Sequence, residues 1–189
     1  MRLFVALHLS LEVRERVTSL LNELQRVDRK PRWVSTDALH VTLKFVGNVP
    51  DEKLPSLDCA LAGVHRPAPI PLEFRGIGYF PNERRPSVLW VGIIAPPELA
   101  SLAEAIDILL TPYDVLRETR PFRPHLTLAR FNDTRLSHAL RAQTEPQRDY
   151  FFGKQFAHEF HLIESRLKSS GAEYTTLRSY PFASQGIAC

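Results

Sequence analysis

The sequence predicts an α+β fold of two pseudo-symmetric lobes, each an antiparallel sheet with helices on its outer face, around a central cleft. Runs with helical spacing alternate with strand-like runs along the 189 residues. One order of elements also occurs twice: helix, strand containing His-x-Thr-Leu, helix, strand, turn, strand. The two motif histidines, His40 and His125, are 85 residues apart, and the same offset relates a strand near residue 87 to one near 172. We interpret this repeat as an internal duplication.

In the first half, residues 2–7 are expected to form a buried strand. Ser10 is a candidate N-cap for an amphipathic helix over 11–28, which Pro31 prevents from continuing. The remaining elements are expected at 38–46 (the first motif strand), 51–63 (a helix), 72–79 and 87–94 (a hairpin).

In the second half, Pro96 and Pro97 open a helix whose buried stripe runs from Leu99 to Leu110. The elements that follow are expected at 122–130 (the second motif strand), 134–143 (a short helix), 154–166 and 172–180 (a hairpin joined through 169–171). The connection at Ala95-Pro96-Pro97 is short and stiff. Residues 1–189 are therefore expected to form a single bilobal domain, with halves at about 1–94 and 95–189.

Composition favours an ordinary globular protein, with 44% hydrophobic and 24% charged residues and a formal net charge of +3. Two cysteines without local spacing, Cys59 and Cys189, predict neither a disulfide framework nor a zinc site. No apolar run approaches the roughly 18 residues that a membrane-spanning helix needs. We expect a cytoplasmic, monomeric protein with no membrane partner.

The doubled motif is the candidate functional site. Side chains in a strand alternate between faces, so His40 and Thr42 share one face, as do His125 and Thr127. A single histidine in a strand is usually structural, but packing alone does not explain two in duplicated settings. If the duplication is pseudo-symmetric, the equivalent strands bring the two histidines to opposite sides of one cleft.

This pattern resembles the two-histidine phosphoesterase superfamily and, within it, the RNA 2′,3′-cyclic phosphodiesterases of the LigT or ThpR type, also called 2′–5′ RNA ligases. The resemblance covers nearly the whole chain. It is carried by the segments Arg2–Leu7, Trp33–Gly47, Gly76–Pro81, Leu89–Gly92, Pro121–Arg130 and Tyr180–Phe182.

The resemblance implies hydrolysis of an RNA 2′,3′-cyclic phosphate end to a 2′-phosphate without metal or other cofactor, and a reverse 2′–5′ ligase activity. His40 would be the proton donor and His125 the proton acceptor, a role that imidazole can fill in either direction near neutral pH. The Thr42 and Thr127 hydroxyls would donate to the non-bridging phosphate oxygens. The expected partner is an RNA or oligonucleotide with a cyclic phosphate end, tRNA halves being one example.

The position five residues after each histidine differs between the copies: it is Phe45 in the first and Arg130 in the second. The resemblance implies that the arginine holds phosphate and that the aromatic ring stacks on a base. In a regular strand both would face away from the histidines, so this role requires a bulge or an early strand end.

Two other functions stay open at this point. One is another two-histidine phosphodiesterase, acting on 2′–5′ oligoadenylate or ADP-ribose cyclic phosphate; the other is a non-catalytic module that binds RNA ends. The remaining histidines suggest no site: His8 has no partner motif, and His158 and His161 fall on opposite faces of a strand, so they cannot chelate a metal together.

Overall fold

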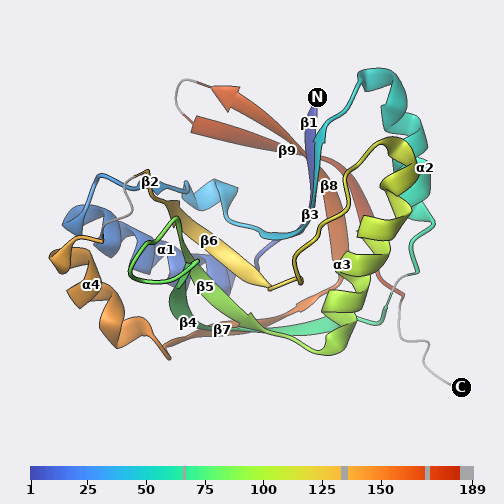
Figure 1. Ribbon diagram of the computed structural model, residues 1–189. Helices are drawn as coiled ribbons and strands as arrows, with labels where there is room; N and C mark the ends of the chain where they lie inside the picture. Colours follow the sequence, from blue (N-terminus) through green and yellow to red (C-terminus); the bar gives the residue numbers. More distant parts are fainter. Residues whose placement is uncertain (66, 133–135, 169–170, 184–189) are drawn as a thin grey trace, which may run out of the picture.

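The computed structural model describes residues 1–65, 67–132, 136–168 and 171–183. The predicted α+β class is confirmed: within these ranges, four α-helices pack against one curled antiparallel sheet (Figure 1). The strands are β1 Arg2–Leu7, β2 Arg32–Trp33, β3 Val41–Asn48, β4 Ile70–Phe80, β5 Val88–Ile94, β6 His125–Arg130, β7 Phe151–Ala157, β8 Glu159–Lys168 and β9 Gly171–Pro181. The helices are α1 Leu11–Val27, α2 Leu54–Ala62, α3 Pro97–Leu109 and α4 His138–Thr144.

The sheet runs in the order β7-β4-β5-β6-β3-β1-β8-β9. The short strand β2 pairs with the C-terminal end of β6. Helices α1 and α4 lie together against one flank, where α1 packs on β7, and α2 and α3 cover the other flank beside β3 and β9 (Figure 1). Each flank therefore combines strands from both halves of the chain. The two motif strands, β3 and β6, are neighbours at the centre of the sheet.

Most expected elements are present within a few residues of their predicted bounds. The strand expected at 154–166 is wrong as a single element. It is interrupted at His158, and the two resulting strands, β7 and β8, take different places in the sheet. The start of the helix expected at 134–143, the turn at Ser169-Ser170 and Cys189 lie outside the described residues. Cys59 is exposed and unbridged.

The sheet has two chemically different faces. Leu3, Val5 and Leu7 of β1 join the main core together with the buried side of α1, which starts at the Ser10 N-cap. The alternate residues Phe4 and Ala6 point the other way and form a small cluster with Ile163 and Tyr174. We call this second face, away from the helices, the site face. Within the described ranges, no helix is both long and apolar enough to cross a membrane.

Candidate active site

The strands β3 and β6 carry both motifs side by side. They pair in antiparallel register at Val41 and Leu126, whose side chains are fully buried on the helix-covered face. Their sequence neighbours therefore point to the site face: His40, immediately before β3, and Thr42 on one side, and His125 and Thr127 of β6 on the other. All four are half-buried. The fold thus gathers four candidate residues around one strand pair.

Each histidine is fixed by the same backbone contact. The Nδ1–H of His40 donates to the carbonyl of Ala38 at 2.7 Å, and the Nδ1–H of His125 donates to the carbonyl of Arg123 at 2.7 Å. A carbonyl can only accept, so each Nδ1 must carry the proton. In the neutral ring, Nε2 is then the nitrogen that can exchange a proton with a ligand.

Aromatic side chains enclose both imidazoles. The ring of His40 lies 4.6 Å from that of Phe4 and meets Tyr174 edge-on at 5.2 Å. On the other strand, Phe80 meets His125 edge-on at 5.0 Å, and the same phenyl ring lies 5.1 Å from Trp90. Such packing removes water from the rings while leaving their nitrogens directed by the backbone.

Burial lowers the pKa of both histidines. It brings the pKa of His40 to about 4; the bond to Ala38 opposes this shift, and the positive charges of protonated His8, of Arg130 and of protonated His125 add to it. The pKa of His125 is also lowered, first by burial and then by the charge of Arg130, against the bond to Arg123. Both imidazoles are therefore neutral at pH 7 in the free protein.

A bulge in each motif strand turns the +5 residue onto the site face. In β3, Ala6 pairs with Thr42 and Val5 with Lys44, so Leu43 is the extra residue, and Phe45 then pairs with Phe4. Phe45 therefore lies on the site face, where its side chain is 58% exposed and its ring lies 6.4 Å from that of Phe4.

The same irregularity occurs at the equivalent place in β6. Trp90 pairs with Thr127 and Leu89 with Ala129, which leaves Leu128 as the extra residue, and Arg130 then pairs with Val88. Leu43 and Leu128 are themselves 85 residues apart, the offset of the histidines. The bulge that the sequence argument required is thus present in both copies. It brings Arg130 to the site face, where its charge acts on His40, His125 and Tyr174.

Among the described residues, no three His, Cys, Asp or Glu side chains come together as a metal-binding group. Burial separates His158, which is exposed, from His161, which is 4% exposed. Sequence reasoning missed one contact: the ring of His161 stacks on that of His8 at 3.9 Å. The signal was the alternation of Phe4, Ala6 and His8 at the end of the first strand, which places His8 on the face of the motif residues.

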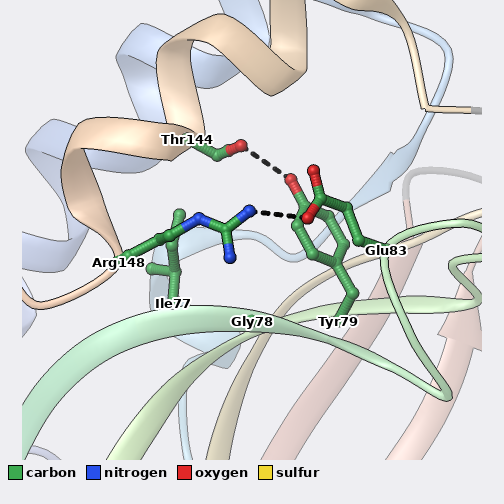
Figure 2. A pocket seen from close by; sticks show the side chains of 6 residues that line it. All are labelled: Ile77, Gly78, Tyr79, Glu83, Thr144 and Arg148. Atoms are coloured by element: carbon green, nitrogen blue, oxygen red, sulfur yellow. Dashed lines mark hydrogen bonds and ion pairs between the residues drawn. The ribbon is translucent and has the colours of Figure 1, made fainter.

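A pocket beneath α4 lies on the other side of β4 and is separate from this site. Figure 2 shows its lining, in which the Tyr79 hydroxyl bonds Thr144 at 2.8 Å and Arg148 pairs with Glu83 at 2.6 Å. Tyr79 alternates along β4 with Gly78 and Phe80, and Phe80 is the residue that contacts His125. The pocket therefore belongs to the helix-covered face.

The comparisons with known proteins agree with this geometry. A family model described as the 2′-5′ RNA ligase superfamily matches residues 9–168. The chain belongs to the 2′-5′ RNA ligase superfamily. It is 35% identical to an RNA 2′,3′-cyclic phosphodiesterase of Thermus thermophilus, over 95% of this chain and 89% of that protein. It is 32% identical to a protein of the same name from Archaeoglobus fulgidus, over 95% of this chain and 99% of the other.

A solved structure of a superfamily member shows the same fold. The crystal structure of Escherichia coli LigT complexed with 3′-AMP has a TM-score of 0.77 to this chain at 28% identity, and the match covers 96% of this chain and 98% of the other. The family predicted from the two motifs is thereby confirmed.

Proposed function

We propose that the protein hydrolyses the 2′,3′-cyclic phosphate end of RNA to a 2′-phosphate by paired imidazole acid–base catalysis. The observation that carries this proposal is the presence of two identically held histidines, each beside a threonine, on adjacent strands of one face. The two relatives described above, both named RNA 2′,3′-cyclic phosphodiesterase, support the reaction. The 3′-AMP bound by E. coli LigT supports a nucleotide as ligand.

In this mechanism His125 takes a proton from water through Nε2 as the water oxygen attacks phosphorus. His40 gives a proton from Nε2 to the departing 3′-oxygen, the P–O3′ bond breaks, and the 2′-phosphate remains. Each proton transfer contributes roughly 10²–10⁴ to the rate. The Thr42 and Thr127 hydroxyls donate to the non-bridging oxygens as charge develops on them.

Because the pKa of His40 is low, protonation of this proton donor depends on the bound substrate. A proton donor must be charged before it acts, and burial keeps His40 neutral in the free protein. A bound phosphate anion raises the pKa of both neighbouring imidazoles, because an opposite charge favours their protonated forms. The substrate therefore brings about the protonation that its own cleavage requires.

Phe45 and Arg130 make the site asymmetric. The exposed ring of Phe45 offers a stacking surface for a base beside His40, whereas the guanidinium of Arg130 offers donors to phosphate. Arg130 also lies opposite Arg32 of β2, another exposed cation on the approach to the site. An RNA end with its negatively charged backbone fits this arrangement.

The decisive experiment is incubation with an oligonucleotide ending in a 2′,3′-cyclic phosphate in the presence of EDTA, with identification of the product. We expect a 2′-phosphate, and a loss of at least 10²-fold for His40→Ala and for His125→Ala. His138→Ala, an exposed histidine at the start of α4, is the matched control and should keep the wild-type rate. Near-normal turnover in both active-site variants would contradict the mechanism.

A substrate panel separates the remaining alternatives. Turnover confined to 2′–5′ oligoadenylate or to ADP-ribose cyclic phosphate would assign another two-histidine phosphodiesterase. Binding of phosphorylated RNA ends without turnover would indicate a non-catalytic module. Ligation, as the reverse reaction, uses the same two histidines with exchanged roles and would be detected by joining a 5′-hydroxyl RNA to the cyclic end. The monomeric state and the cytoplasmic location stay predictions.

A further inference from the structure

Two further histidines lie on the site face, next to the candidate catalytic residues. His161 of β8 pairs with Ala6 of β1, and Ala6 pairs with Thr42 of β3. Neighbouring strands are about 4.8 Å apart, so His161 lies roughly 10 Å from Thr42 across the small side chain of Ala6. His8 follows β1 two residues after Ala6 and therefore points to the same face.

The two rings form a rigid stack. Their centroids are 3.9 Å apart and their planes differ by 14°. The inner ring, His161, is 4% exposed and its Nδ1 lies 2.9 Å from the Ser179 hydroxyl. The backbone of the outer residue, His8, is held because its carbonyl accepts a bond from the Gln155 side chain at 2.8 Å.

The outer ring remains accessible. His8 is exposed, and its Nε2 lies 3.4 Å from the Thr176 hydroxyl. Burial lowers the pKa of His161 to about 4 and also lowers that of His8. The pair thus presents a flat, uncharged aromatic surface at neutral pH. Such a surface suits a nucleobase, since RNA-binding proteins stack unpaired bases on aromatic rings that include histidine.

Two separate aromatic surfaces therefore flank His40. Phe4, Phe45 and Tyr174 lie on one side of it. On the other side, the pairing of Leu7 with Val41, extended by one residue, places His8 beside His40, and His8 in its protonated form lowers the pKa of His40. A nucleoside has one base and can occupy one of these surfaces. A second surface fits the base of the adjoining nucleotide.

We propose that the stacked pair His8–His161 is a subsite for the base of the penultimate nucleotide of an RNA end. This inference rests on the proposed function, and it adds that the enzyme prefers an oligonucleotide end to a cyclic mononucleotide. Stacking of one base on an aromatic side chain contributes about 1–3 kcal/mol. Removal of the His8 ring should therefore cost about 5- to 150-fold in kcat/KM on a substrate with a penultimate base.

The test compares three substrates: adenosine 2′,3′-cyclic phosphate, the diadenosine dinucleotide with the same cyclic end, and that dinucleotide without its penultimate base. Wild type, His8→Ala and His8→Phe are assayed, with His138→Ala as control. The readout is the ratio of kcat/KM for the full dinucleotide to that for each shorter form. Any effect of the His8 substitutions on the pKa of His40 acts on all three substrates and cancels in this ratio.

We expect wild type to prefer the full dinucleotide, His8→Ala to lose that preference, and His8→Phe to restore it. Deleting the base and deleting the ring should cost the same factor and should not add in combination, as expected when both remove one contact. Additive losses, or a preference that survives in His8→Ala, would overturn the subsite. Failure of wild type to hydrolyse any of the three would instead overturn the proposed function.

Discussion

The two candidate catalytic imidazoles are alike in how the backbone holds them and different in their charged surroundings. Both donate from Nδ1 to a carbonyl two residues upstream, which fixes the tautomer without a carboxylate partner. Carboxylates would raise the pKa of each ring, whereas here burial and the Arg130 charge lower it. The site is therefore poised to respond to an anion.

This arrangement predicts the pH dependence of the reaction. The profile of kcat/KM reports groups of the free enzyme, so it should be bell-shaped. Its optimum should lie below the usual histidine pKa of 6.5, because the pKa of His40 is about 4 and that of His125 is also lowered. Bound phosphate raises the pKa of both rings, so the optimum of kcat should lie at higher pH. Steady-state kinetics from pH 4 to 9 measure both profiles.

Arg130→Gln provides a second test of this prediction, with Arg85→Gln as its control. Loss of the guanidinium removes a charge that lowers both histidine pKa values, so the limbs of the kcat/KM profile should move to higher pH. Arg85→Gln, in the exposed turn between β4 and β5, should leave them in place. A kcat/KM optimum at or above pH 7 in wild type would contradict the expected electrostatics.

At the scale of the element, the bulge in β3 determines two things at once. It turns Phe45 to the site face and sends Lys44 into the core, where Lys44 is 7% exposed and pairs with Asp107 of α3. Asp107 also accepts the backbone N–H of Glu118 at 3.1 Å and the Arg117 side chain at 3.2 Å. Burial favours a raised pKa for Asp107, but these donors hold it below its usual value.

Breaking the Lys44–Asp107 pair should destabilise the protein strongly. Asp107→Asn keeps the shape of the side chain but leaves the Lys44 charge buried without a counter-ion, which costs about 3–5 kcal/mol in the free energy of unfolding. Asp114→Asn is the matched control, because Asp114 pairs with Lys53 while its side chain is 84% exposed, and such pairs contribute about 0–1 kcal/mol. Urea denaturation measures both; equal losses would refute the structural role of the buried pair.

Some features of the elements could be predicted from the sequence and others could not. Hydrophobic spacing and caps predict α1 and α3 well, because each has one apolar stripe and a Ser or Pro at its start. The His-x-Thr alternation places four side chains on one face. The bulges at Leu43 and Leu128 could only be stated as a requirement, since both residues suit a regular strand and their irregular pairing depends on the neighbours β1 and β5.

The order of the strands in the sheet could not be predicted from the sequence for a related reason. The stretch 154–166 is expected from the sequence to be one strand, yet β7 pairs with β4 at one end of the sheet and β8 pairs with β1 near the other. Long-range pairing of this kind leaves no local pattern. The stack of His8 on His161 was missed because it joins residues 153 positions apart through that pairing.

At the scale of the whole molecule, the two halves of the sequence repeat are not separated in space. Strand β1 of the first half pairs with β8 of the second half, β3 of the first half pairs with β6 of the second, and helix α1 packs against β7. A lobe built from one half alone would lack the partners of both its sheet and its helix. This interleaving supports the prediction that residues 1–189 form one bilobal domain.

That prediction can be tested by cutting the chain at the boundary between the halves. We expect the intact protein to unfold in a single cooperative transition followed by circular dichroism. Fragments 1–94 and 95–189 should each fail to show one, because β1 then loses β8 and α1 loses β7. Mixing the two fragments supplies the missing strands and should restore the transition together with cyclic phosphate hydrolysis. Cooperative unfolding of either fragment alone would show that the halves are independent domains.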